Sequence, residues 1–519
     1  MENKYSRAKV SLYSPIMPED QDKSIQALWV ALGHFSSFGL TIISAAILSR
    51  YFSKIEYGTY RQVLYVYNTL LILFTVGLPQ VFAYYLPRYK REQGLDIVYK
   101  ISKLLLLTGI LFSLFLYFFA GIIATLLKNP ELATGLKFFS PIPALLLPTM
   151  GIEGIFSTYK KTIYIALYNI ITRFLTLLFI VLPVILLNGT YIYSICGWVI
   201  VSILSFFIAI WFKRIPFLKI KSKTCHLSYS TILSYSIPLV GAGIAGMAAK
   251  ASYHFYISIS FGPQIFADFA NGFIEIPFVA MVTSAASTIL LPIFSKQIHD
   301  KADINNITSV WNSTIIKSAM IIYPLVLFFI CHADTVITLL YSSKYLDAAN
   351  FFRIAMILNF FNIIVFAPLL LAMGQTAYYA KIHVYFAIIA WTGGFILLQI
   401  INMPATIAVF ATSLGIIKVI IFTRHSARLL EIPVLTMIPL KRLMVLFLNG
   451  LVILVPLKMI LSKLLPQINP FLELTVNFTI FLILFILLTK LFYIDYRIII
   501  QPFIEKLLHG KGQNRPTRQ

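Results

Sequence analysis

Residues 101–127 read ISKLLLLTGILFSLFLYFFAGIIATLL, an apolar stretch interrupted by a single charge. A helix needs about 20 mainly apolar residues to cross the hydrocarbon core of a bilayer, and this stretch is long enough. Comparable stretches, separated by short basic or turn-forming breaks, follow one another from residue 26 to residue 493. Because helices satisfy their own backbone hydrogen bonds in lipid, the pattern predicts an all-α, polytopic membrane protein.

Apolar runs between charge clusters predict about 14 transmembrane helices. With 59% hydrophobic and only 12% charged residues, the composition excludes an ordinary soluble enzyme. The predicted spans are residues 26–50, 62–86, 101–127, 136–158, 162–187, 190–212, 229–255, 264–293, 310–341, 347–373, 378–401, 404–423, 441–463 and 471–493.

These spans predict a division of the chain into two six-helix bundles and two additional helices. The two bundles are joined by a cytoplasmic linker, and a cytoplasmic segment is expected at each end. The predicted units are a cytoplasmic N-terminal segment 1–25, an N-terminal bundle 26–212, a linker 213–228, a C-terminal bundle 229–425, two further transmembrane helices 426–493 and a basic tail 494–519.

The distribution of basic residues predicts the orientation of the spans. A net charge of +23 would suggest nucleic-acid binding in a soluble chain. Here much of the excess lies in the short breaks, where lysine and arginine favour the cytoplasmic side. One alternate set of breaks carries 18 basic residues and the other carries eight. We therefore expect both chain ends in the cytoplasm and no nucleic-acid partner.

Two segments of the chain repeat one pattern. The aromatic positions of FSKIEYGTY (residues 52–60) recur in FGPQIFADF (residues 261–269). The span after each copy ends in Leu-Pro-x-aromatic-x-basic, as LPRYKR at 86–91 and LPIFSK at 291–296. Because six spans separate the copies, they predict two parallel bundles related by an axis along the membrane normal. A substrate site between the bundles is typical of such transporters.

No catalytic, metal or cofactor site is predicted. Residues 241–246, GAGIAG, match a dinucleotide-binding pattern by letters but lack its strand and acidic residue. Small residues of this kind instead let membrane helices pack closely. The three cysteines, Cys196, Cys225 and Cys331, have no paired spacing, and no histidine pair has metal-ligand spacing. The breaks are short, so transport is favoured over catalysis.

Four basic residues are candidates for binding a substrate. An ionisable side chain within a span costs about 2.5–3.5 kcal/mol on insertion scales and normally faces protein or water. Arg61, Arg173, Lys250 and Arg353 predict a cationic cavity between the bundles. Such a cavity suits an anion, especially a phosphate, because arginine offers forked donors. The alternative that long side chains reach the headgroups stays open, and it applies to Lys418 as well.

Two acidic residues are candidates for binding or releasing a coupling cation. Asp268 and Glu275 fall in the eighth predicted span. Their spacing to Asn271 predicts that all three lie on one face of a helix.

Three motifs carry a resemblance to a known family. They are LSRYFSKIEYGTY at residues 48–60 followed by Gly77-Leu78, LPIFS at 291–295, and LLY at 339–341 with Tyr345 and Ala348-Ala349. Together with span number, repeat and loop lengths over nearly the whole chain, they resemble polysaccharide-biosynthesis flippases of the O-antigen (Wzx) type. This superfamily also holds MATE-type multidrug exporters and lipid II flippases. Asp268 departs from the family, since many relatives would have a small or hydroxyl residue there.

The resemblance implies a cargo, a location and partners. The cargo would be an oligosaccharide repeat unit linked by a diphosphate to a polyprenol lipid, turned over to the outer face of the bacterial inner membrane. A gradient of H+ or Na+ would drive alternation between inward- and outward-open states, with polysaccharide polymerase machinery as a further candidate partner. Arg173, Lys250 and Arg353 would contact the diphosphate or sugar, and Glu275 with Asp268 would couple the cation.

Three alternatives stay open. A MATE-like small-molecule exporter is disfavoured by the two extra helices and by a cavity poor in acidic residues. A lipid II-type precursor flippase handles a similar diphosphate, so the sequence discriminates poorly against it. A membrane polymerase or ligase typically carries a sizeable outer loop, whereas the outer breaks of this chain are all short.

Overall fold

A computed structural model describes residues 39–218, 220–464, 469–492, 494, 496 and 497. The predicted segment 1–25, the start of the first span and nearly all of the tail 494–519 lie outside these residues. Within the described residues the secondary structure is helical, which confirms the all-α membrane architecture. Ten of these helices are long and apolar enough to cross a membrane, or eleven if Lys54–Thr75 and Leu78–Arg88 form one bent span. The predicted number of 14 is not confirmed.

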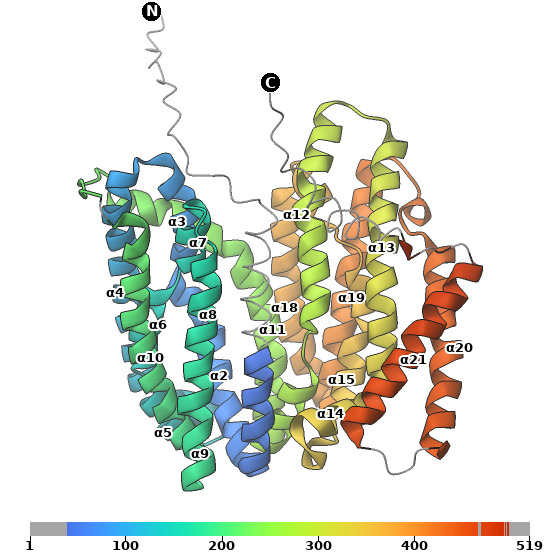
Figure 1. Cartoon of the computed structure of the whole chain (residues 1–519), viewed down its shortest axis with the longest axis horizontal. Helices are drawn as coiled ribbons and strands as arrows, with labels where there is room; N and C mark the ends of the chain where they lie inside the picture. The colour runs from blue at the N-terminus through green and yellow to red at the C-terminus, as the bar shows by residue number, and fades with distance from the viewer. Residues whose placement is uncertain (1–38, 219, 465–468, 493, 495, 498–519) are drawn as a thin grey trace, which may run out of the picture.

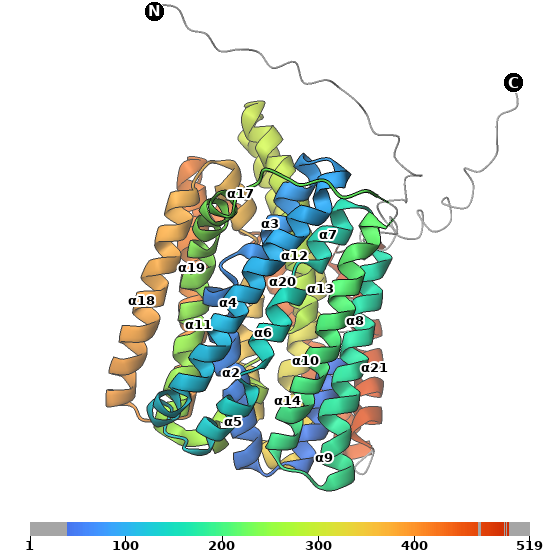
Figure 2. The same ribbon diagram turned by 90° about the vertical axis from the view of Figure 1, so that its left-hand side faces the viewer.

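The helices form two groups and a final pair (Figure 1). We call residues 39–217 the N-terminal group. It contains the helix Gly39–Tyr51, α2 Lys54–Thr75, α3 Leu78–Tyr85, α4 Arg91–Leu126, α5 Glu131–Phe139, α6 Ile142–Leu146, α7 Ile152–Thr158, α8 Ile163–Thr176, α9 Leu182–Leu187 and α10 Tyr191–Arg214. Figure 2 turns this group toward the viewer, where α4, α8 and α10 run in a similar direction along the height of the molecule.

We call residues 229–429 the C-terminal group. It contains α11 Tyr229–Gly272, α12 Pro277–His299, α13 Ile304–Cys331, α14 Ala333–Tyr341, α15 Ala348–Ile357, α16 Asn359–Asn362, α17 Ala367–Ala372, α18 Thr376–Ile400 and α19 Pro404–Leu429. The pair α20 Leu440–Leu464 and α21 Pro470–Leu491 lies beside α13 at the edge of the molecule. The two groups meet where α2 packs against α11.

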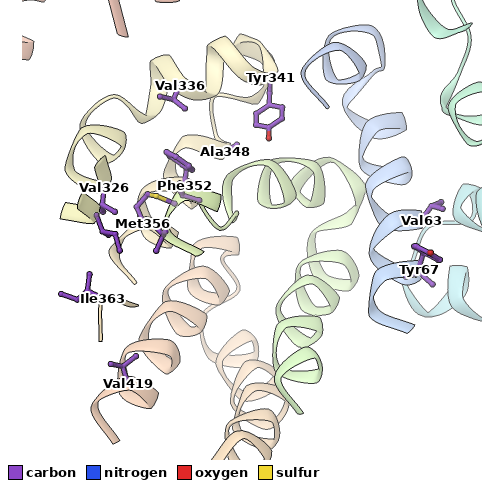
Figure 3. Close-up of a cluster of buried hydrophobic side chains, with 14 of the residues drawn as sticks. Val63, Tyr67, Val326, Val336, Tyr341, Ala348, Phe352, Met356, Ile363 and Val419 are labelled. Carbon is purple, nitrogen blue, oxygen red and sulfur yellow. The ribbon is translucent and has the colours of Figure 1, made fainter. Parts of the chain in front are cut away.

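Exposed and buried faces of the long helices are both apolar, as expected for spans in lipid. On α4, Leu105 and Phe112 are buried while Leu111 and Phe118 are exposed. The interior is packed with aliphatic and aromatic side chains. Figure 3 shows Phe352 and Met356 of α15 beside Val326 of α13, and shows Val63 and Tyr67 on α2.

The sequence prediction of one continuous helix over residues 264–293 is wrong. α11 ends at Gly272, and residues 273–276 are not helical before α12 begins at Pro277. The residue before a proline avoids the helical region, and Ile276 is accordingly extended (φ −76°, ψ 121°). Glu275 lies in this break, so it does not share a helical face with Asp268 and Asn271 as the spacing predicted.

Both copies of the repeat place a backbone break near the same aromatic pattern. In the first copy, Ser53 caps α2 and forms a capping box with Glu56. In the second copy α11 is kinked at Gly262, which has a φ of 75° that glycine adopts easily. Gly58 of α2 faces this kink, because a Cβ on Gly58 would lie 1.9 Å from the carbonyl oxygen of Pro263.

Candidate functional site

A cavity of about 640 Å³ opens between the two helix groups. Arg61 of α2, Arg173 of α8 and Lys250 of α11 all line it, so the structure brings three of the four predicted basic residues together. None of the described residues lining this cavity is acidic. The structure places Arg61 and Lys250 on a shared cavity wall, whereas the alternative prediction was that their side chains reach the headgroups.

Uncharged polar groups of the N-terminal group also line this cavity. They include Asn68, Thr69, Asn169, Thr172, Thr176 and Ser205. Aromatic rings of Tyr65, Tyr168 and Trp198 lie among them. Amides, hydroxyls and aromatic faces are groups that form hydrogen bonds and stacking contacts with polar ligands.

A second cavity of about 590 Å³ lies within the C-terminal group. Lys250 and His254 line both cavities, and Lys418 of α19 and Glu275 line the second. Lys250 Nζ lies 2.5 Å from Glu275 Oε1. Both side chains are largely exposed, at 63% and 73%, so this ion pair lies where a ligand in the cavity could reach it.

The two groups are joined at one end of the cavity by contacts that we call the interface cluster. On the N-terminal side it consists of Arg50, Lys54, Tyr57 and Arg61, and on the C-terminal side of Asp268, Ala270, Asn271, Leu339, Leu340 and Lys344.

Arginine and lysine side chains bind backbone carbonyl groups across this interface. Arg50 donates hydrogen bonds to the carbonyl oxygens of Leu340 (2.9 Å) and Leu339 (2.6 Å). In the opposite direction, Lys344 donates to the carbonyl oxygens of Arg50 (3.0 Å) and Phe52 (2.7 Å). Helix-terminal carbonyl groups lack partners within their own helix, so these donors satisfy them.

Two further contacts join α2 to the end of α11. Lys54 Nζ lies 2.7 Å from Asp268 Oδ2. The Tyr57 hydroxyl donates to Asn271 Oδ1 at 3.0 Å. Asp268 is fully buried here and does not line either cavity, so it lies apart from Glu275.

Arg61 belongs both to the interface cluster and to the lining of the first cavity. Its Nη2 donates to the carbonyl oxygen of Ala270 at 2.6 Å. These residues are 209 positions apart, the same offset that relates the two copies of the sequence repeat. Corresponding positions of the two copies therefore meet at the interface, as expected near a pseudo-two-fold axis.

Arg353 lies elsewhere. It forms an ion pair with Asp334 of α14 and donates to Asn350 Oδ1 at 3.1 Å. The described linings of the two cavities do not include it. The sequence could not separate Arg353 from the cavity residues, because its position within a span is similar to theirs.

Lys418 was not among the four basic residues predicted to bind a substrate, and the structure places it in the second cavity. The only signal in the sequence was a lysine inside an apolar span. No cluster of three His, Cys, Asp or Glu side chains that could hold a metal ion occurs in the part of the chain that the structure describes.

Comparison with known families adds to this geometry. A model of the polysaccharide biosynthesis protein family matches residues 47–350, which is more than half of the chain. The chain belongs to this family. No curated protein matches it in sequence.

Solved structures of membrane transporters share the fold. A lipid II flippase, MurJ, in an inward closed conformation aligns with a TM-score of 0.68 at 16% identity, over 90% of this chain and 99% of its own. An inward-facing MATE family multidrug resistance transporter of the MOP superfamily aligns with a TM-score of 0.55 at 13% sequence identity, over 78% of this chain and 94% of its own. A MOP superfamily transporter from Pyrococcus furiosus aligns with a TM-score of 0.55 at 12% sequence identity, over 78% of this chain and 95% of its own. The member of the polysaccharide biosynthesis family described here therefore has the fold of multi-pass membrane transporters and flippases.

Proposed function

We propose that the chain is a flippase for polyprenyl-diphosphate-linked oligosaccharides. It moves these repeat units from the cytoplasmic to the outer face of the bacterial inner membrane, where they serve surface polysaccharide synthesis. The observation that carries this proposal is the convergence of Arg61, Arg173 and Lys250 in one cavity whose described lining contains no acidic residue. Membership of the polysaccharide biosynthesis family supports the choice of a glycan as cargo.

The cavity offers hydrogen-bonding and charged partners to the sugar and the diphosphate of this cargo, which the hydrocarbon of the bilayer lacks. Sugar hydroxyls and a diphosphate are costly to place in hydrocarbon without partners. The basic residues suit the diphosphate, because charge-assisted hydrogen bonds to phosphate are strong and directional. Asn68, Asn169 and Trp198, on the N-terminal side of the cavity, suit the glycan. The polyprenol tail stays in the lipid.

We assign the interface cluster to the outer side of the membrane. The break at residues 88–100 and the described part of the break at 213–228 lie at the opposite end, where Lys223 pairs with Glu92. By the positive-inside rule that end faces the cytoplasm, together with both chain ends. The structure then corresponds to a state closed toward the outside, and transport requires the interface cluster to open.

A cation gradient of H+ or Na+ would drive this alternation. Glu275 is the better placed coupling residue of the two predicted from sequence, because it faces a cavity and contacts Lys250. Asp268 would act through the interface cluster, since its carboxylate joins the two helix groups.

A lipid II-type precursor flippase is the second candidate. It is favoured by the coverage of the MurJ alignment, which includes 99% of that flippase. A MATE-like exporter of cationic compounds is disfavoured, because the cavity that faces both groups presents positive charge and no described acidic lining residue.

Deletion and restoration of the gene tests the proposal. The proposal predicts that deletion abolishes surface polysaccharide while complete lipid-linked repeat units build up, and that cell wall synthesis continues. Lysis with accumulation of the peptidoglycan precursor would favour the lipid II candidate. Unchanged surface glycan with new sensitivity to cationic dyes would favour the exporter.

A further inference from the structure

The described lining of the second cavity has more positive than negative side chains. Two lysines, Lys250 and Lys418, line it, and Glu275 is the single acid among the described lining residues. Glu275 contacts Lys250. Lys418 makes no hydrogen bond or ion pair with any residue that the structure describes, although its charge interacts with those of Lys250 and Glu275. An ammonium group within a span that lacks a direct partner is stabilised by an anion nearby.

The existing ion pair is suited to displacement. Because both side chains of the Lys250–Glu275 pair are more than half exposed, solvent screens their attraction and the pair contributes little net stability. A diphosphate carries more negative charge and more acceptor oxygens than one carboxylate. It can therefore contact two ammonium groups at once, which Glu275 does not do here.

Amide groups complete the polar side of this cavity. Asn359 and Asn362 of α16 line it together with His383 of α18. Side-chain amides donate hydrogen bonds to phosphate oxygens without adding charge. The second cavity shares Lys250 with the first, so a ligand bound to Lys250 can extend from it into the first cavity.

We infer that Lys250 and Lys418 form the diphosphate-binding subsite, and that Glu275 occupies this subsite as an internal counter-anion until the cargo displaces it. The inference rests on the proposed function and adds the position of the diphosphate within the molecule. It also gives Glu275 a specific task, since the same anion that binds the lysines releases its carboxylate.

Displacement of Glu275 has a consequence for the interface cluster. Glu275 lies in the non-helical residues 273–276, directly after the segment that carries Ala270 and Asn271. Both residues bind α2, through Arg61 and Tyr57. Cargo binding in the cavity thus frees a segment attached to the contacts that hold the two helix groups together.

Binding measurements on the purified full-length protein test the inference. The probes are geranylgeranyl diphosphate and inorganic pyrophosphate, titrated calorimetrically in detergent. Lys418→Met is expected to weaken binding of the lipid diphosphate about tenfold, as for loss of one charged hydrogen bond. Glu275→Gln is expected to strengthen binding several-fold, because the internal competitor is gone. Lys381→Met, which changes a lysine outside both described cavity linings, is the control and is expected to leave binding unchanged.

Two results would overturn the inference. One is binding by Lys418→Met equal to that of the control, and the other is weaker binding by Glu275→Gln. If Lys418→Met does not fold, Lys418→Arg keeps the charge and is expected to bind, whereas Lys418→Gln is expected to bind weakly. Tighter binding of the lipid than of pyrophosphate identifies a lipid-linked diphosphate, and equal binding identifies a site for the free anion.

Glycan export separates failure of this inference from failure of the proposed function. If restoring the gene recovers glycan export but the lysine and glutamate variants bind diphosphate as the parent does, the diphosphate lies elsewhere and the flippase function stands. If gene deletion leaves glycan export intact, the proposed function is wrong whatever the binding data show.

Discussion

Lys54 Nζ lies 2.7 Å from Asp268 Oδ2 and so joins α2 to the end of α11 across the boundary between the two helix groups. The Asp268 side chain is fully buried, while that of Lys54 is one-quarter exposed. Asp268 Oδ1 is buried with no hydrogen-bond partner among the described residues. The carboxylate therefore depends on Lys54, and the pair joins the two sides of the interface cluster.

The dependence on Lys54 predicts unequal effects of removing either partner. Lys54→Met leaves a buried carboxylate without compensation, and we expect a loss of about 1–3 kcal/mol, less than for a fully buried pair because Lys54 is partly solvated. Asp268→Asn is expected to cost less, since the lysine can turn to solvent. The double variant should recover most of the loss. Thermal unfolding in detergent measures all three, and equal losses for the single variants would contradict the dependence.

A side chain added at Gly58 is expected to disturb the contact between α2 and α11. A Cβ at this position would meet the Pro263 carbonyl oxygen at 1.9 Å, so Gly58→Ala pushes α2 away from α11. Overpacking costs about 1–3 kcal/mol, which shifts a conformational balance about fivefold or more. We expect reduced glycan export and greater labelling, from the outside, of a cysteine placed at Thr69 in the first cavity.

Gly121→Ala is the matched control for this substitution. Gly121 lies in α4, and a Cβ there meets no atom within 4 Å, so export and labelling should match the parent. Equal behaviour of the two alanine variants would show that the contact between α2 and α11 does not govern access to the cavity.

Two arginines in similar sequence contexts should differ in their importance for export. Arg173 lines the first cavity, whereas Arg353 pairs with Asp334 outside both described linings. We expect Arg173→Met to reduce glycan export about tenfold or more, and Arg173→Lys to retain an intermediate level because lysine lacks the forked donors. Arg353→Met should retain most export. Export measured at matched protein levels tests this, and the reverse order would remove Arg173 from the cargo site.

Labelling of single cysteines tests the proposed orientation of the molecule in the membrane. In a background with the three native cysteines replaced by alanine, a cysteine at Lys128 is expected to react with an impermeant thiol reagent in intact spheroplasts. A cysteine at Lys301, in the break between α12 and α13, should react only after permeabilisation. The opposite pattern would invert the assignment of the interface cluster to the outer side.

Apolar stretches and the sequence repeat predicted structural features that depend on residues close together in the chain. The apolar stretch at 101–127 falls in α4 apart from its last residue, and the repeated segments 52–60 and 261–269 contact each other through Lys54 and Asp268. The apolar span was predictable because the length of a hydrophobic run is a property of consecutive residues.

Features that depend on tertiary contacts could not be predicted in this way. Lys418 and Arg353 are both basic residues within apolar spans, yet of the two only Lys418 is among the described residues that line the first or second cavity. Asp268 pairs with a lysine from the other helix group, a partner that no local spacing indicates. The helix break before Pro277 was foreseeable from the proline, but the regular spacing of Asp268 and Glu275 concealed it.

The sidedness of lipid-linked oligosaccharide in cells depleted of the protein tests translocation most directly. Spheroplasts would be treated with a lectin that cannot cross the membrane, and the fraction of lipid-linked repeat units that it binds would be measured before and after depletion. We predict that depletion causes complete units to accumulate and that they remain inaccessible to the lectin until the membrane is permeabilised. Accumulated units that bind lectin in intact spheroplasts would contradict the flippase assignment, because the block would then follow translocation.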